Sequence, residues 1–259
     1  MKIKECIPYL IAFIALFVGV FYDYQITDAL HESVPFVGLV FERIVLIPIE
    51  GVVMFTMCLL YRKYHKLWIL ILAYAGAWYV IHDSLHYWMN VKTPLMMGVI
   101  LVASLLLVVL CVYILRKVSD DWVNRHINFF VFYTAVLLSA VVLTSCIKHF
   151  WGRIRYRDIE ELSQFCVWYK PCGLIGNRSF PSGHITAMTT IICMLQWKQH
   201  HFEKVSILRY VFVGAMILIM GVSRMIMGAH FLSDLAAGFL ITYTCYLVIR
   251  NLFIRRGKL

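Results

Sequence analysis

Three short polar segments, each next to a long apolar run, contain the residues of this sequence that could do chemistry. In the first, Lys148 and Arg155 lie seven positions apart, so both side chains are expected along one face of an extended helix end. Two cations on one face could bind a single anion. The alternative is that they are interfacial cations that extend their charged ends toward water.

The second segment, residues 181–184, reads Pro-Ser-Gly-His. Proline suits the first turn of a helix, and glycine lets a ligand approach the backbone closely. Because free amides at a helix N-terminus bind phosphate, Ser182, Gly183 and His184 are predicted to form an anion cradle that contains a titratable imidazole. The alternative is that this segment only starts a helix.

The third segment contains Arg224, His230 and Asp234. His230 and Asp234 lie four positions apart and therefore share one face at the start of a helix. A carboxylate at that offset can accept the Nδ1–H of the imidazole, which leaves Nε2 free as a nucleophile. Charge at membrane depth is costly and usually functional, so this pair is predicted to be more than a helix start.

Together the three segments predict phosphoryl transfer. A phosphate monoester carries about −1.5 to −2 charges near neutral pH, which Lys148, Arg155 and Arg224 would roughly balance. His230 is predicted to attack phosphorus in line and form a phosphohistidine. His184 is predicted to protonate the leaving alkoxide and then to activate the water that hydrolyses the intermediate. This scheme requires no metal and no other cofactor.

The elements that must position these residues are membrane helices. The chain has 259 residues, of which 62% are hydrophobic and 15% charged, so lipid is expected to be the solvent for most of it. Crossing the hydrocarbon core as a helix takes about 20 apolar residues. Eight runs qualify: 6–22, 44–61, 67–81, 94–115, 127–147, 181–197, 205–223 and 230–249.

Lysine and arginine in the connecting segments indicate the orientation. If the N-terminus is inside, the inner segments hold fifteen of the 24 basic residues and the outer segments hold nine. This bias predicts that both termini are cytoplasmic and that all three polar segments face outward. The net charge of +10 is then a topology signal and an attraction to anionic lipid headgroups, not a nucleic-acid footprint.

The loop between the fifth and sixth runs holds further polar residues. Cys166 and Cys172 both lie in it and could form a disulfide if that side is oxidising. Four basic side chains crowd the catalytic segments and are predicted to be solvated loop charges, with binding of a second phosphate or headgroup as the alternative. They are His149, Arg153, Arg157 and Arg178.

In order and spacing, the three segments resemble the type 2 phosphatidic acid phosphatases, whose pattern reads Lys-x6-Arg-Pro, Pro-Ser-Gly-His and Ser-Arg-x5-His-x3-Asp. Every gap within each motif matches here and the order of the motifs is kept, with one departure: Tyr156 stands where the pattern has proline. Tyr156 can set the exit of the chain from the helix only by packing. Over about residues 148–249, the resemblance implies a helical core, a histidine nucleophile (His230), an acid/base histidine (His184) and a metal-independent mechanism.

Members of this family commonly have six spans, with the first motif after the third. Five runs precede that motif here, which predicts an all-α polytopic bundle with a six-helix phosphatase core and about two extra helices in the N-terminal half. A single membrane-embedded domain over residues 1–259 is expected, with its catalytic half at about 127–250. Because five is odd like three, the site still faces outward.

The predicted function is that of a phosphatase in the plasma (inner) membrane that removes the terminal phosphate of a lipid phosphate or pyrophosphate. Phosphatidic acid, phosphatidylglycerol phosphate and a polyprenyl diphosphate are the candidate substrates. Alternatives are a lipid phosphotransferase that uses the same phosphohistidine and a non-catalytic lipid-binding or transport protein. The expected partners are the bilayer and the lipid substrate, without nucleic acid, and the sequence predicts no oligomeric state.

Overall fold

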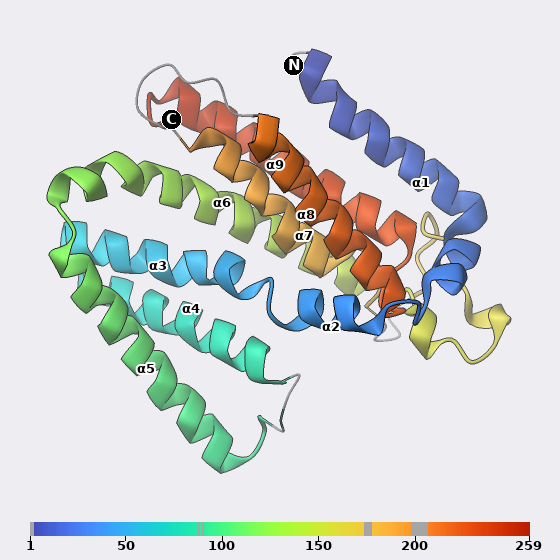
Figure 1. Cartoon of the computed structure of the whole chain (residues 1–259), viewed down its shortest axis with the longest axis horizontal. Coiled ribbons are helices and arrows are strands. Elements are labelled where there is room, and N and C mark those ends of the chain that lie inside the picture. Colours follow the sequence, from blue (N-terminus) through green and yellow to red (C-terminus); the bar gives the residue numbers. More distant parts are fainter. Residues whose placement is uncertain (1–2, 87–88, 90, 174–177, 198–206) are drawn as a thin grey trace. The chain divides into compact units, whose positions relative to one another are not determined.

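The computed structural model describes residues 3–86, 89, 91–173, 178–197 and 207–259, and within them the regular structure is helical, which confirms the predicted all-α class. The α-helices are α1 Ile3–Leu30, α2 Pro35–Arg43, α3 Ile47–Tyr64, α4 Leu67–His86, α5 Pro94–Lys117, α6 Asp120–Trp151, α7 Gly183–Thr189, α8 Ile207–Ile226 and α9 Leu232–Arg255 (Figure 1). Short 3-10 helices are η1 Tyr156–Asp158, η2 Leu162–Gln164 and η3 Thr190–Gln196.

Seven helical stretches among the described residues are long and apolar enough to cross a membrane. They are Glu5–Leu30, Gly38–Tyr64, Leu67–His86, Pro94–Lys117, Asp120–Asp158, Ile207–Ile226 and Leu232–Arg255. The chain is therefore an integral membrane protein. The predicted run at 181–197 is also helical, but as the shorter succession of α7 and η3.

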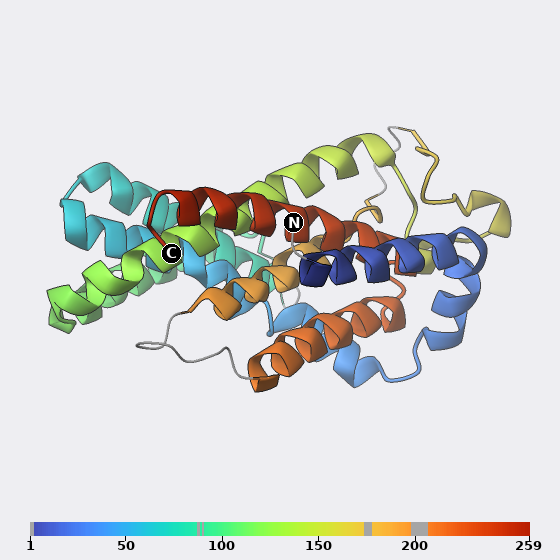
Figure 2. The same cartoon turned by 90° about the horizontal axis from the view of Figure 1, so that it is seen from above.

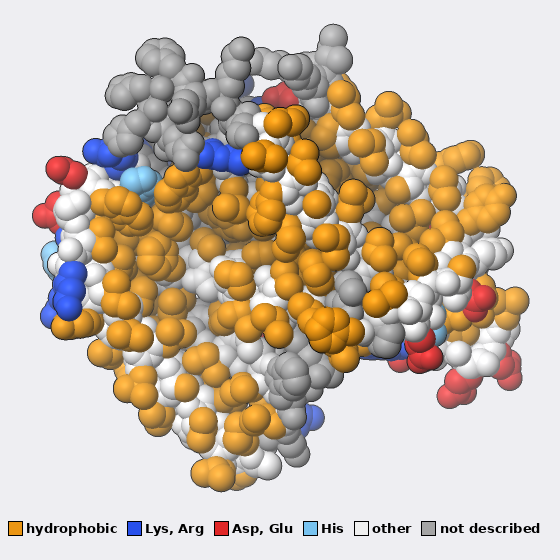
Figure 3. Space-filling model, viewed as in Figure 1, with side chains coloured by type: hydrophobic (Ala, Val, Ile, Leu, Met, Phe, Trp, Pro, Cys, Tyr) orange, Lys and Arg blue, Asp and Glu red, His pale blue; other side chains and the backbone are white. Residues whose placement is uncertain are grey.

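Large apolar side chains are exposed along the membrane helices, as expected for surfaces that contact lipid. Examples are Phe17 on α1, Leu106 on α5 and Leu218 on α8. Figure 3 shows such side chains spread over one face of the molecule. Exposed apolar surface on this scale would be unfavourable in water, whereas acyl chains solvate it.

The chain divides into two compact units, each built from two separate stretches of sequence. Unit 1 is Met1–Glu42 with Val136–Ile249, and unit 2 is Arg43–Ala135 with Arg250–Leu259. The residues of α6 contribute to both. All eight residues predicted to form the site belong to unit 1. The single-domain organisation stays a prediction.

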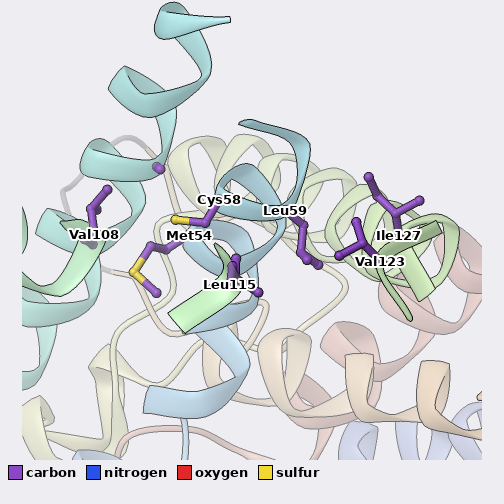
Figure 4. Close-up of a cluster of buried hydrophobic side chains, with 9 residues drawn as sticks. Met54, Cys58, Leu59, Val108, Leu115, Val123 and Ile127 are labelled. Atoms are coloured by element: carbon purple, nitrogen blue, oxygen red, sulfur yellow. The ribbon is translucent and has the colours of Figure 1, made fainter. Parts of the chain in front are cut away.

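Unit 2 contains α3, α4, α5 and the first half of α6 around an apolar core that includes Cys58, Leu59 and Val108 (Figure 4). Small residues let α4 approach α3: a Cβ added at Gly76 would lie 3.2 Å from the backbone nitrogen of Met54. Close packing of backbones is what stabilises helix pairs in lipid, where apolar burial gives little driving force. The site residues predicted from the sequence all lie outside this unit.

In unit 1, buried threonines and a glycine join α7 to its neighbours. The hydroxyl groups of Thr144 on α6 and Thr186 on α7 are 2.9 Å apart, and Thr242 on α9 donates to the carbonyl oxygen of Thr186 at 3.1 Å. One helical turn before Thr242, a Cβ added at Gly238 would lie only 2.6 Å from the carbonyl oxygen of Ser182. Glycine at 238 therefore lets α9 pass close to the start of α7.

The C-terminal end of α1 lies beside the loop that follows α6, as both views show (Figures 1 and 2). Trp168 of that loop donates its indole N–H to the carbonyl oxygen of Leu16 at 3.0 Å. The same loop is held to α6 because Trp151 donates to the carbonyl oxygen of Trp168 at 2.8 Å. The loop is thus fastened at two helices.

Replacement of Gly238 by alanine tests this close approach. We expect Gly238→Ala to lower the melting temperature of the detergent-solubilised protein, because overpacking a filled site costs roughly 1 to 3 kcal/mol. Gly214→Ala on α8 is the matched control, since an added Cβ there meets no atom within 4 Å. That control should melt at the same temperature as the wild type or slightly above it. Equal melting temperatures for the two variants would contradict the packing described.

Candidate active site

The three predicted segments meet at one end of unit 1. Ser182 donates its backbone N–H to the carbonyl oxygen of Asp234 at 3.0 Å. The ring centroids of His184 and His230 are 6.5 Å apart. A Cβ added at Gly183 would lie 3.8 Å from Nζ of Lys148. Residues from the end of α6, the start of α7 and the start of α9 therefore lie close together.

Ser182 starts α7 as the sequence predicts. Its side-chain oxygen accepts the N–H of Ile185 at 3.4 Å, so Ser182 is the N-cap of α7. Gly183 and His184 are then the first two residues of the helix. The partial positive charge of a helix N-terminus is favourable for anions. Gly183 and His184 are partly exposed, whereas Ser182 is buried.

His230 and Asp234 form the predicted pair at the start of α9. His230 is almost fully buried, and its Nδ1 lies 3.6 Å from Oδ2 of Asp234, somewhat longer than a hydrogen bond. That carboxylate oxygen accepts two other hydrogen bonds, from Ser179 Oγ at 2.5 Å and from the backbone N–H of Phe231 at 2.9 Å. The second bond caps α9, and the two together fix Asp234 beside the imidazole.

Arg153 completes the surroundings of Asp234, and here the prediction of a solvated loop charge is wrong. Its side chain is wholly buried. Nη1 donates to Oδ1 of Asp234 at 2.6 Å, and Nη2 donates to Oδ2 of Asp23 on α1 at 2.9 Å. The guanidinium also lies 4.2 Å from the ring centroid of Phe231. The other three loop cations, His149, Arg157 and Arg178, are exposed as expected.

Arg224, a predicted phosphate ligand at the end of α8, is buried and already has an anionic neighbour. Its Nη1 donates to Oε1 of Glu42 on α2 at 3.0 Å, and its Nη2 donates to the carbonyl oxygen of Gly38 at 2.9 Å. Glu42 is 182 positions away in the sequence, so no motif spacing points to it. Two residues of α2 therefore orient the guanidinium of Arg224, and the carboxylate of Glu42 partly neutralises its charge.

The two histidines are held neutral. Burial, aided by the charges of Lys148 and Arg155 and opposed by Asp234, lowers the pKa of His230 to about 4. Burial and then the charge of Arg224 lower the pKa of His184 well below its ordinary value. Both residues lie outside the seven candidate spans. A neutral imidazole is the form that can attack phosphorus or accept a proton.

Tyr156, where the sequence departs from the family pattern, packs against the C-terminal end of α1 and the residue that follows it. Its hydroxyl donates to Oδ1 of Asp28 at 2.5 Å. Its ring centroid lies 5.3 Å from that of Tyr24 and 5.1 Å from that of His31. Aromatic packing and one hydrogen bond thus set the exit of the chain from α6, where a proline would set it through its fixed backbone angle.

Cys166 and Cys172 form a disulfide, with their Cα atoms 6.4 Å apart. Both backbones hold the segment that follows α6: Cys172 donates its N–H to the carbonyl oxygen of Trp151 at 2.7 Å, and the carbonyl oxygen of Cys166 accepts from Nε of Arg153 at 2.8 Å. Gly152, which lies between Trp151 and Arg153, has φ of +65°. It approaches the carbonyl oxygen of Gly173 so closely that no side chain would fit at position 152. The disulfide loop therefore fixes the segment that carries Arg153.

Among the residues that the structure describes, no group of three or more His, Cys, Asp or Glu side chains is arranged to hold a metal ion. The groups that converge at the site are imidazoles, cations and backbone amides. These are the groups that phosphate-binding and phosphoryl-transfer sites use.

The protonation state of His230 can be measured directly. We expect its imidazole to remain neutral at pH 5.5, because its pKa is lowered to about 4 by burial. Nitrogen NMR of histidine-labelled protein in detergent would report this, with the His230 signal assigned by its loss in His230→Asn. In denaturant the same ring should titrate at about 6.5, the ordinary value. A midpoint near 6.5 in the folded protein would contradict the burial of this side chain.

One comparison with known proteins identifies a family. The model of the PAP2 superfamily matches residues 129–258, half of the chain and the part that carries all eight predicted site residues. Comparison with curated proteins and with solved structures gave no match. The chain is thus an integral membrane protein that belongs to the PAP2 superfamily, whose members are typically metal-independent phosphatases.

Proposed function

We propose that this protein is a phosphatase that removes the terminal phosphate of a lipid phosphate or lipid pyrophosphate through a phosphohistidine at His230. The observation that carries the proposal is the pairing of two imidazoles, His230 and His184, with ring centroids 6.5 Å apart at the start of two helices. Reacting atoms approach to about 3 to 3.5 Å before attack. At this separation the two imidazoles are close enough to act on the same phosphoryl group.

The first half of the reaction forms the intermediate. Nε2 of neutral His230 attacks phosphorus, the ester P–O bond breaks, and protonated His184 gives its proton to the leaving oxygen. His184 must gain that proton as substrate binds, and a bound phosphate anion favours this because it opposes the nearby cations. The positive charge that develops on the ring of His230 faces the carboxylate of Asp234, 3.6 Å from Nδ1.

The second half releases phosphate. His184, now neutral, takes a proton from water; the water oxygen attacks phosphorus, and the P–N bond breaks. His230 returns to its neutral form. Lys148, Arg155 and Arg224 balance the charge of the phosphoryl oxygens, and the backbone amides at the N-terminus of α7 add hydrogen-bond donors.

The position of the site supports a lipid substrate. His184 and His230 lie where α7 begins and where α8 gives way to α9, at the ends of apolar helices. Helix ends lie at the level of lipid headgroups, where phosphorylated lipids are concentrated in two dimensions. The excess of basic residues in the segments expected inside, and the disulfide beside the site, favour an outward-facing site on an oxidising side of the plasma membrane.

Turnover by histidine variants tests the proposal. We expect His230→Asn and His184→Asn each to reduce phosphate release from phosphatidic acid, or from the best substrate in a panel with phosphatidylglycerol phosphate and a polyprenyl diphosphate. The reduction should be about 10²- to 10⁴-fold, the usual contribution of a general acid or base, and more for the nucleophile. His149→Asn, at an exposed position on α6, is the matched control and should keep wild-type turnover.

Two reagents complete this test. Vanadate, which adopts five-coordinate geometry like the transition state, should inhibit the wild type. A chelator such as EDTA should leave turnover unchanged. Phosphate release that survives in His230→Asn, or that a chelator abolishes, would refute the mechanism. Transfer of phosphate to an added lipid rather than to water would identify a phosphotransferase instead.

A further inference from the structure

We propose that Asp23 of α1 is a positioning residue for the catalytic pair: it binds one terminal nitrogen of Arg153 while Asp234 binds the other, so that the net charge of the cluster beside phosphorylated His230 stays negative. The inference rests on the proposed function. It also assigns a role to α1, which lies outside the segment that matches the family, residues 129–258.

Asp23 is buried, and both of its carboxylate oxygens have partners at the start of α9. Oδ1 accepts the backbone N–H of Ser233 at 2.9 Å. Oδ2 accepts from Nη2 of Arg153 at 2.9 Å and from the hydroxyl of Ser233. A Cβ added at Gly19, one turn earlier on α1, would lie 2.9 Å from Cβ of Ser233. Glycine at that position therefore permits the approach that places Asp23 next to Arg153.

The charges explain why this contact bears on catalysis. One guanidinium lies between two carboxylates, with one terminal nitrogen directed at Asp23 and the other at Asp234. The three groups together carry one negative charge. Without Asp23, the full positive charge of Arg153 would act on Asp234 alone. The second carboxylate thus preserves the negative charge next to His230, where a low dielectric makes it effective.

Stability alone does not account for this arrangement. Burying ion pairs gains little over packing apolar groups of similar volume, because desolvation offsets the attraction. A carboxylate inside a membrane helix is costly for the same reason and is usually functional. Asp23 is such a residue, since it lies within the candidate span Glu5–Leu30.

The test is Asp23→Asn, measured on the full-length protein in detergent. Asparagine keeps the shape and a hydrogen-bond acceptor, and it leaves Arg153 and Asp234 as a one-to-one ion pair, so no unpaired charge is buried. We expect phosphoenzyme formation and kcat to fall by roughly 10- to 100-fold, the range usual for groups that orient a histidine indirectly. The KM and the inhibition by inorganic phosphate should stay at wild-type values, because the phosphate ligands are untouched. Asp121→Asn, at an exposed carboxylate in the first turn of α6, is the control and should leave kcat unchanged.

The competing interpretation is that Asp23 only ties α1 to α9. It predicts that inhibition by inorganic phosphate weakens together with kcat and with the melting temperature, and that result would overturn the proposal, as would a wild-type kcat. If Asp23→Asn does not fold, Ser233→Ala is the second variant to measure. It removes the hydroxyl group that hydrogen-bonds to both Arg153 and Asp23, and it leaves every charge in place. A retained kcat in Ser233→Ala supports the charge role, and a loss as large as that expected for Asp23→Asn refutes it. Activity that persists in His230→Asn would instead refute the proposed function itself.

Discussion

One buried guanidinium determines how the active end of unit 1 is assembled. Arg153 binds Asp23 from α1 and Asp234 from α9, and its Nε donates to a carbonyl oxygen in the disulfide loop. A guanidinium has fixed, planar donor directions, so three segments that are distant in the sequence must take up one mutual arrangement to satisfy it. Leaving the buried charge of Arg153 without one of these partners would be strongly unfavourable. The three contacts are therefore expected to form together or not at all.

The consequences of this constraint extend to each part of the proposed chemistry. Asp234 is held against the first turn of α9, so it lies beside His230 before substrate binds. The backbone of Asp234 in turn accepts from Ser182, which sets α7 and its free amides next to the same space. Gly238 allows that contact because it has no side chain. Preorganisation of this kind lowers the reorganisation required at the transition state.

The sequence could predict the helices and the motif residues because both leave local signals. Apolar runs of membrane length and fixed spacings such as that of His230 and Asp234 can be read along the chain. The sequence does not predict a role for Asp23, because the first apolar run ends at about residue 22, whereas α1 continues to Leu30 and contains Asp23. The sequence does not predict the burial of Arg153 or the contact of Glu42 with Arg224 for a related reason: the contacts of Arg153 with Asp23 and of Arg224 with Glu42 span 130 and 182 positions, and spacing rules do not reach so far. An acidic residue at the edge of an apolar run was the available signal for Asp23.

The central claim is that Nε2 of His230 attacks phosphorus, and the covalent intermediate tests it most directly. Protein mixed with lipid phosphate would be quenched with base, which preserves phosphohistidine, and digested, and the phosphorylated residue would be located by mass spectrometry. We predict a phosphoryl group on residue 230 that is lost in acid. A catalytically active protein that forms no phosphoenzyme, or that carries the phosphoryl group on any other residue, would contradict the account.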